Sequence, residues 1–130
     1  MELSQVATRS QRISRGRVLV VEDDDANRWV LSALLKDEGY EVETAADVPE
    51  ALVRIQRPAD YEAVLLDVQL AERSGLELIP PIREHCAKTK IMLLSGRFDL
   101  EALRPGVDAV FPKGGSFSEF LGALAKMVSC

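Results

Sequence analysis

Ala63-Val64-Leu65-Leu66-Asp67 is the stretch of sequence that decides the fold class of this chain. Four consecutive apolar residues followed by one carboxylate are typical of a short strand buried on both faces, as in a parallel sheet covered by helices. In open sheets of this kind, ligands bind in the crevice at the carboxyl ends of the strands. The pattern therefore places Asp67 at the edge of a sheet where a ligand would bind.

Other apolar runs in the chain repeat this form, because each of them ends in a polar side chain. They are residues 18–21, which end in Glu22 and Asp23, residues 91–94, which end in Ser95, and residues 109–112, which end in Lys113. The carboxyl ends of neighbouring parallel strands lie at the same edge of a sheet. If these strands are parallel neighbours, carboxylates, a hydroxyl and an amine converge there.

Between the strands, apolar residues recur at helical spacing, so strands and helices alternate along the chain. This alternation predicts an α/β fold: a flavodoxin-like, five-stranded parallel sheet of order 2-1-3-4-5, with right-handed connections and helices on both faces. A further strand is expected at residues 41–45. The expected helices are residues 25–38, a segment between Asp47 and Pro58, and residues 75–85, 100–104 and 116–128.

Two of these helices are expected to be irregular. Pro80 and Pro81 fall inside the third helix, and an interior proline costs about 3 kcal/mol because it removes a backbone donor and clashes with the preceding turn. We therefore expect a kinked or shortened helix there. The fourth helix is shortened because little chain separates residue 95 from Lys113. Trp29, on the first helix, is expected in the core or at a half-buried surface.

The composition is that of one ordinary globular domain, with 47% hydrophobic and 28% charged residues among 130. A net charge of −5 argues against nucleic acid as a partner, and no apolar run is long enough to span a membrane. Cys86 and Cys130 fit neither a metal-binding spacing nor a disulfide framework, which indicates a reducing, cytoplasmic location. Residues 1–16 are expected to be a flexible N-terminal tail before a domain of residues 17–130.

The strand-end side chains suggest phosphoryl chemistry at a metal site. Glu22, Asp23 and Asp67 would repel one another, and a divalent cation with all-oxygen ligands, Mg²⁺ or Mn²⁺, would relieve that repulsion. An aspartate that faces a metal-bound phosphoryl group can attack the phosphorus and form an acyl phosphate. Ser95 would then donate a hydrogen bond to a phosphoryl oxygen, and Lys113 would supply the opposite charge.

Each of these residues also has an ordinary structural explanation when it is considered alone. Residues 22–25 could form a solvated acidic turn that caps a helix, and Asp67 could be a loop residue. Ser95 before Gly96 is ordinary turn chemistry, and Lys113 could be a surface lysine. The combination of these residue types at four strand ends, in a spacing that fits one fold, favours the functional interpretation.

The chain resembles a receiver domain of two-component response regulators, the CheY-like family, over residues 17–128. The order and spacing of short motifs carry the resemblance. They are residues 18–28 (VLVVEDDDANR), 39–45 (GYEVETA), 64–67 (VLLD), 75–78 (GLEL) and 92–96 (MLLSG).

The resemblance implies that Asp67 accepts a phosphoryl group from a histidine kinase or a histidine phosphotransfer protein. It also implies that Ser95 is the switch hydroxyl and that Lys113 is the family's lysine, which supplies the counter-charge to the phosphoryl group. Asp23 is the preferred direct metal ligand of the acidic pair. The full set of ligands implied for Mg²⁺ is Glu22, Asp23, Asp67 and the backbone carbonyl of Gln69.

The sequence departs from the family pattern at four places. Leu70-Ala71 replaces the usual Met-Pro after the phosphoacceptor. Lys113 is followed by Gly114-Gly115 instead of proline, and the position of the switch aromatic falls on Val110. The segment between Ser95 and Lys113 is about four residues shorter than usual, roughly one helical turn. This last departure affects the fourth helix, which belongs to the family's usual output and dimerisation face.

We therefore expect a phosphorelay receiver domain that is a monomer or weak dimer and not an enzyme. Phosphorylation would shift a two-state equilibrium, and a downstream target protein would read the shifted state by contact. One alternative is a receiver-like binding module that acts without phosphorylation. Another is a Mg²⁺-dependent aspartyl phosphatase, which needs a second acid two residues after the nucleophile, where this chain has Gln69.

Overall fold

The computed structural model describes residues 14–57, 60–96 and 104–129 of the 130. The helix expected at residues 100–104 therefore falls almost entirely outside the described residues, as does most of the expected tail. Arg15 and Gly16, which the sequence assigns to that tail, bond to residues just before and at the start of the second strand. The N–H of Arg15 donates to the carbonyl of Gly39 at 3.1 Å, and the N–H of Glu41 donates to the carbonyl of Gly16 at 2.9 Å.

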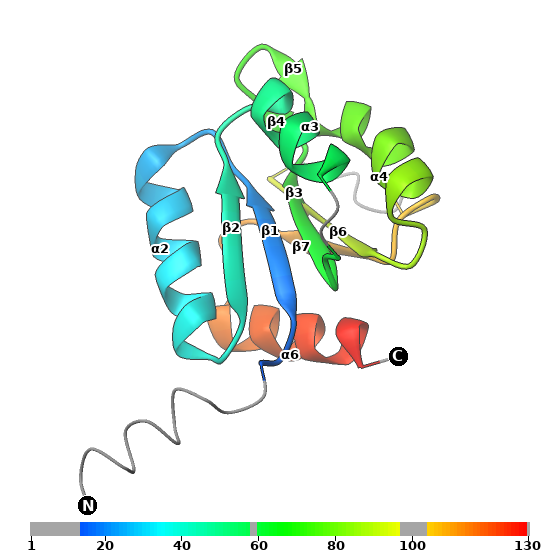
Figure 1. The fold of residues 1–130 in the computed structure, drawn as a ribbon. Coiled ribbons are helices and arrows are strands. Elements are labelled where there is room, and N and C mark those ends of the chain that lie inside the picture. Colours follow the sequence, from blue (N-terminus) through cyan, green and yellow to red (C-terminus); the bar gives the residue numbers. More distant parts are fainter. Residues whose placement is uncertain (1–13, 58–59, 97–103, 130) are drawn as a thin grey trace, which may run out of the picture.

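A five-stranded parallel sheet forms the centre of the molecule (Figure 1). In order across the sheet, its strands are β2 (Glu41–Ala45), β1 (Arg17–Val21), β3 (Ala63–Asp67), β6 (Lys90–Ser95) and β7 (Ala109–Pro112). Counted along the chain, this is the order 2-1-3-4-5, so the sequence prediction is confirmed. Every residue of β3 is buried, as its apolar run predicted.

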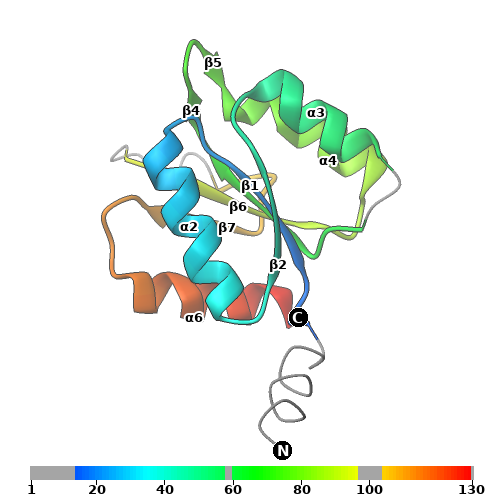
Figure 2. The ribbon, with the colours of Figure 1, turned by 60° about the vertical axis from the view of Figure 1, so that its left-hand side comes forward.

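Helices cover both faces of the sheet, as expected (Figure 2). On one face lie α2 (Asp25–Asp37) and α6 (Phe117–Val128); on the other lie α3 (Val48–Gln56), the 3-10 turn η1 (Gly75–Leu78) and α4 (Ile79–His85). Successive side chains of a strand point to opposite faces, so β1 contributes to two cores. Val18 and Val20 belong to the core beneath α2 and α6, whereas Leu19 and Val21 belong to the core beneath α3 and α4.

Aspartate side chains begin the helices that follow β1 and β2. Asp24 accepts a hydrogen bond from the N–H of Asn27 at 2.8 Å, and Asp47 accepts one from the N–H of Glu50 at 2.9 Å. Such a cap satisfies a helix donor that otherwise lacks a partner, and it contributes about 1 kcal/mol. The cap at Asp24 starts α2 immediately after the acidic end of β1, which holds that acidic segment at the sheet edge.

The helix expected over residues 75–85 is shortened, as predicted, but its prolines do not lie in its interior. A 3-10 turn runs from Gly75 to Leu78, and the α-helix begins only at Ile79. Pro80 and Pro81 therefore lie in the first turn of α4 and not in a helix interior. The backbone N–H groups of a first turn have no partner within the helix, so proline there removes no hydrogen bond.

A short antiparallel hairpin follows β3, and sequence reasoning did not predict it. Its strands are β4 (Gln69–Leu70) and β5 (Arg73–Ser74), joined by a two-residue turn. Ala71, in that turn, has a φ of 54°. This left-handed conformation is uncommon for a residue with a side chain.

Trp29 lies at the surface, contrary to the expectation that it is in the core or half-buried. Its side chain is 72% exposed, and the neighbouring Val30 is 46% exposed. The one fully buried residue of α2 is Leu35, and Leu31 packs against the same core. Because α2 meets the sheet through that stripe, Trp29 falls on the opposite side of the helix. Among the described residues, no helix has the length and apolar character needed to cross a lipid bilayer.

Candidate functional site

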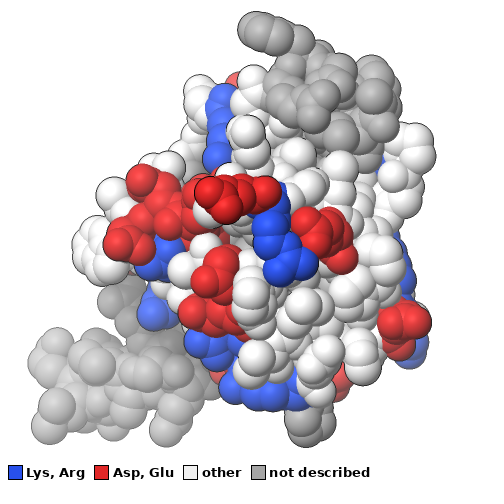
Figure 3. All heavy atoms as spheres, turned by 90° about the horizontal axis from the view of Figure 1, so that it is seen from above, with Lys and Arg blue, Asp and Glu red and all other residues white. Residues whose placement is uncertain are grey.

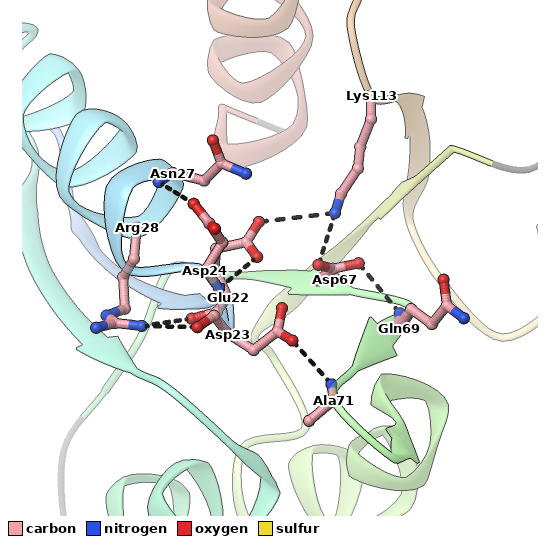
Figure 4. Close-up of polar contacts among 9 residues, drawn as sticks. All are labelled: Glu22, Asp23, Asp24, Asn27, Arg28, Asp67, Gln69, Ala71 and Lys113. Carbon is pink, nitrogen blue, oxygen red and sulfur yellow. Dashed lines mark hydrogen bonds and ion pairs between the residues drawn. The ribbon is translucent and has the colours of Figure 1, made fainter.

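Three carboxylates meet at the carboxyl edge of the sheet (Figure 4). Glu22 and Asp23 follow β1, and Asp67 is the last residue of β3. One carboxylate oxygen from each lies within 4.8 Å of the others. Glu22 and Asp67 are buried, whereas Asp23 is exposed. Figure 3, which looks down on this end of the molecule, shows acidic side chains gathered over it.

Lys113, in the loop after β7, places its ammonium group against these carboxylates. Its Nζ lies 2.6 Å from Oδ2 of Asp67 and 3.7 Å from Oε1 of Glu22. Partial burial acts to lower the pKa of Lys113, but the hydrogen bond and the charge of Asp67 outweigh it and raise that pKa. The amine therefore stays protonated at neutral pH, and one positive charge faces three carboxylates.

The raised pKa of Glu22 indicates that the negative charge of the cluster is not fully balanced by Lys113. Burial raises the pKa of Glu22 to about 7, and the negative charge of Asp67 adds to this effect against the hydrogen bond from the N–H of Asp24. Glu22 is buried beside two other carboxylates and is therefore difficult to ionise. A cation with more than one charge would stabilise its ionised form. Three oxygen donors with an exposed side suit a hard divalent ion that keeps several waters. The residues present therefore fit a divalent metal.

Backbone and side-chain donors orient the carboxylates. The N–H of Gln69 donates to Oδ1 of Asp67 at 3.1 Å, so both oxygens of Asp67 have a partner. The Arg28 guanidinium donates to the carbonyl of Glu22 at 2.9 Å and to the carbonyl of Asp23 at 3.4 Å. These bonds hold the acidic segment in place before any ligand arrives.

Sequence reasoning missed two of the contributing groups, Arg28 and Ala71. The N–H of Ala71 donates to Oδ2 of Asp23 at 2.9 Å. An arginine one helical turn after the cap Asp24 is a signal that could have identified Arg28. No side-chain signal could have identified Ala71, since a backbone N–H is common to almost every residue.

Ser95 and Gln69 hold different positions relative to the acidic cluster. Ser95 is buried at the end of β6, in the strand beside β3, where its neighbour Leu94 is paired with Asp67. The hydroxyl of Ser95 thus comes from the strand end next to Asp67. Gln69 is exposed and contributes its N–H to Asp67. Its carbonyl as a metal ligand stays a prediction.

The stability of the metal-free protein is expected to fall as the pH rises from about 4.5 to about 7. Glu22 has a pKa of about 7 when folded and 4.5 as its ordinary value, so the folded state binds more protons in that range. Unfolding is then favoured as the pH increases, by an amount on the order of 3 kcal/mol. Urea unfolding across this range, with a chelator present, measures the slope.

A Glu22→Gln variant serves as the control for this pH dependence. Glutamine keeps an oxygen that can accept the N–H of Asp24 but does not ionise. The unfolding free energy should therefore vary less with pH in the variant than in the wild type. Near pH 7 the variant should be the more stable of the two proteins. An equal slope in the two proteins would contradict the assignment of the titration to Glu22.

The fold and the site together define a class of protein. It has an open parallel sheet with a cluster of carboxylates and a paired lysine at its carboxyl edge. The chain belongs to the response regulator receiver domain family, whose model matches residues 18–125. The resemblance inferred from the sequence motifs is therefore confirmed. The family consists of signalling modules of two-component systems.

Curated relatives include the cell cycle transcriptional regulator CtrA of Caulobacter vibrioides, which is 36% identical over 85 residues. This alignment covers 65% of the present chain and 36% of that protein. The cell cycle response regulator CtrA of Brucella ovis matches with the same identity and coverage. The chain thus spans about a third of the length of these relatives.

Solved structures of the same fold include liganded receiver proteins. The response regulator TrrA of Thermotoga maritima, in complex with Mg²⁺-BeF, is 33% identical with a TM-score of 0.74, over 85% of this chain and 97% of that one. A response regulator of Burkholderia pseudomallei is 27% identical with a TM-score of 0.76, over 87% of this chain and 68% of that one. Its structure contains a phosphorylated aspartic acid, a calcium ion and citrate.

Proposed function

We propose that this chain is a phosphoryl-accepting switch in which Asp67 receives the phosphoryl group from a histidine kinase or a histidine phosphotransfer protein. The observation that carries the proposal is the contact of Lys113 with Asp67 at 2.6 Å, inside a cluster with Glu22 and Asp23. A nucleophilic carboxylate, a metal pocket and a fixed positive charge thus meet at one point. These are the groups that phosphoryl transfer to an aspartate requires.

We propose that the metal is Mg²⁺, held by the carboxylates of Glu22, Asp23 and Asp67 and by the carbonyl of Gln69. When bound, the ion neutralises the carboxylates and the charge on the phosphoryl oxygens. The raised pKa of Glu22 supports this assignment, because metal binding would favour its ionised form. The Mg²⁺-BeF complex of the Thermotoga maritima relative also supports it.

The transfer step forms one bond and breaks another. A carboxylate oxygen of Asp67 attacks the phosphorus, while the P–N bond of the donor's phosphohistidine breaks and its electron pair returns to the imidazole. Lys113 stays protonated and pairs with the oxygens of the incoming group. The O–H of Ser95, from the neighbouring strand end, then donates a hydrogen bond to a phosphoryl oxygen, and this hydrogen bond distinguishes the phosphorylated state.

The output of the switch is a change that a downstream target protein reads by contact. We propose a signalling role and not catalysis for this chain, because the residue two positions after Asp67 is Gln69, which cannot protonate a leaving group as a phosphatase requires. A cytoplasmic location, inferred from the cysteine usage, stays a prediction, and so does a monomeric or weakly dimeric state.

Intact-protein mass after incubation with acetyl phosphate, with and without Mg²⁺, tests the proposal. We expect one phosphoryl adduct that forms only with Mg²⁺ and that maps to the peptide containing Asp67. Calcium in place of Mg²⁺ is the matched condition that separates a need for charge from a need for the smaller ion. A folded protein that binds Mg²⁺ but gains no adduct would instead support a receiver-like module that acts without phosphorylation.

A further inference from the structure

We propose that the backbone amide of Ala71 is a positioning group for the metal site: it holds the carboxylate of Asp23 and thereby couples the β4–β5 hairpin to metal binding. The inference rests on the proposed function, because it concerns the same metal pocket. The inference also gives a role to one departure from the family pattern, Ala71 in place of the usual proline, because proline has no N–H to donate.

The contact joins residues that are far apart in the chain. The N–H of Ala71 donates to Oδ2 of Asp23 at 2.9 Å, across 48 positions of sequence (Figure 4). Asp23 is the exposed member of the acidic cluster, so packing alone does not fix its side chain. A carboxylate has about four acceptor positions on its two oxygens, and this hydrogen bond leaves most of them for a cation. The amide thus selects one orientation of Asp23 without blocking it.

The hairpin that presents this amide is firmly attached. Leu70, just before the turn, is buried in the core beneath α3 and α4. After the turn, Arg73 forms an ion pair with Glu77 at 2.6 Å. At the base of the hairpin, the N–H of Gly75 donates to the carbonyl of Val68 at 2.7 Å. A donor on such an element keeps its direction, so it can pre-organise the side chain that it contacts.

The fixed orientation of Asp23 favours metal binding. A carboxylate that already keeps one orientation binds a cation with less cost in conformational freedom. Loss of the amide should therefore weaken metal binding while leaving the chemistry at Asp67 intact.

Two variants of the full chain test the amide. Ala71→Pro removes the N–H and also changes the turn, because proline fixes φ at about −65°, whereas Ala71→Gly keeps the N–H and suits the φ of 54°. By calorimetry, we expect the dissociation constant for Mg²⁺ to rise about tenfold in the proline variant and to stay within about twofold in the glycine variant. The half-saturating Mg²⁺ concentration for reaction with acetyl phosphate should rise by the same factor, and the rate at saturating Mg²⁺ should stay unchanged.

A second measurement on metal-free protein needs no proline variant, which could distort the turn. The amide resonance of Ala71 is compared by NMR between the wild type and Asp23→Ala. We expect it to move upfield and to exchange faster with solvent in the variant, while the amide of Gly75, bonded to Val68, stays unchanged. An unaltered Ala71 amide would overturn the inference.

The outcomes distinguish this inference from the proposed function. If the wild type binds Mg²⁺ and Ala71→Pro, shown by circular dichroism to be folded, binds it equally well, the inference fails and the proposed function stands. If Ala71→Pro does not fold, the NMR comparison decides. If the wild type binds no Mg²⁺, the metal assignment itself fails, whatever the Ala71 amide does in the metal-free protein.

Discussion

An Asp67→Asn variant is expected to take up no phosphoryl group from acetyl phosphate at any Mg²⁺ concentration, a loss of about a hundredfold or more. The amide of asparagine is not a nucleophile under these conditions, and no other described carboxylate has the lysine ammonium at 2.6 Å. Asparagine has the shape of aspartate and keeps an oxygen for the N–H of Gln69. The variant should therefore fold, and urea unfolding checks that it does. Intact mass reports the adduct.

The matched control for this experiment is Asp60→Asn, which makes the same chemical change at an exposed aspartate. Its phosphoryl uptake should equal that of the wild type. An adduct that persists in Asp67→Asn would contradict the assignment of Asp67, and peptide mapping would then identify the true acceptor. An adduct lost in both variants would indicate a general effect of charge and not the loss of a nucleophile.

A Gly75→Ala variant is expected to lose about 2–4 kcal/mol of unfolding free energy. A Cβ at Gly75 would lie 1.9 Å from the carbonyl oxygen of Asp67 and 3.2 Å from Cδ1 of Leu66. Both neighbours belong to the buried strand β3, so neither can move without disturbing the sheet. The variant should also weaken Mg²⁺ binding, because displacement of Gly75 moves the hairpin that contacts Asp23. Urea unfolding and calorimetry measure the two effects.

Gly122→Ala provides a control of opposite sign. Gly122 lies in the middle of α6, is exposed, and a Cβ there would meet no atom within 4 Å. Alanine should stabilise the helix by up to about 1 kcal/mol and leave Mg²⁺ binding unchanged. If Gly75→Ala proved as stable as the wild type, then Asp67 would not be held by the close approach of this glycine.

The fold could be predicted because its signals are local in the sequence. The run from Ala63 to Leu66 contains only apolar residues, and a strand buried on both faces needs that composition. Helical spacing between such runs then limits the topology to few choices, since connections between parallel strands are right-handed. The polar residues at strand ends follow from the same reasoning, and the structure brings Glu22, Asp23, Asp67 and Lys113 together.

The irregular elements could not be predicted in the same way. The β4–β5 hairpin has strands of two residues each, too short for any periodicity to appear. Pro80 and Pro81 indicated an irregular helix, but whether they would interrupt it or begin it depends on where the 3-10 turn ends. The exposure of Trp29 depends on which side of α2 meets the sheet, and an apolar residue on either side fits a helical pattern.

The sequence by itself thus determined the strand order, the layers and the kinds of side chain at the sheet edge, because these follow from residue type and spacing along a single segment. Only the tertiary structure decided how the site is held. The hydrogen bond from Ala71 to Asp23 and the contact of Arg28 with the acidic segment join residues that are apart in the sequence. The raised pKa of Glu22 depends on burial. Almost every residue type has a backbone N–H, so the sequence does not show which N–H will act as a donor at the site. Burial arises only when the whole chain is packed.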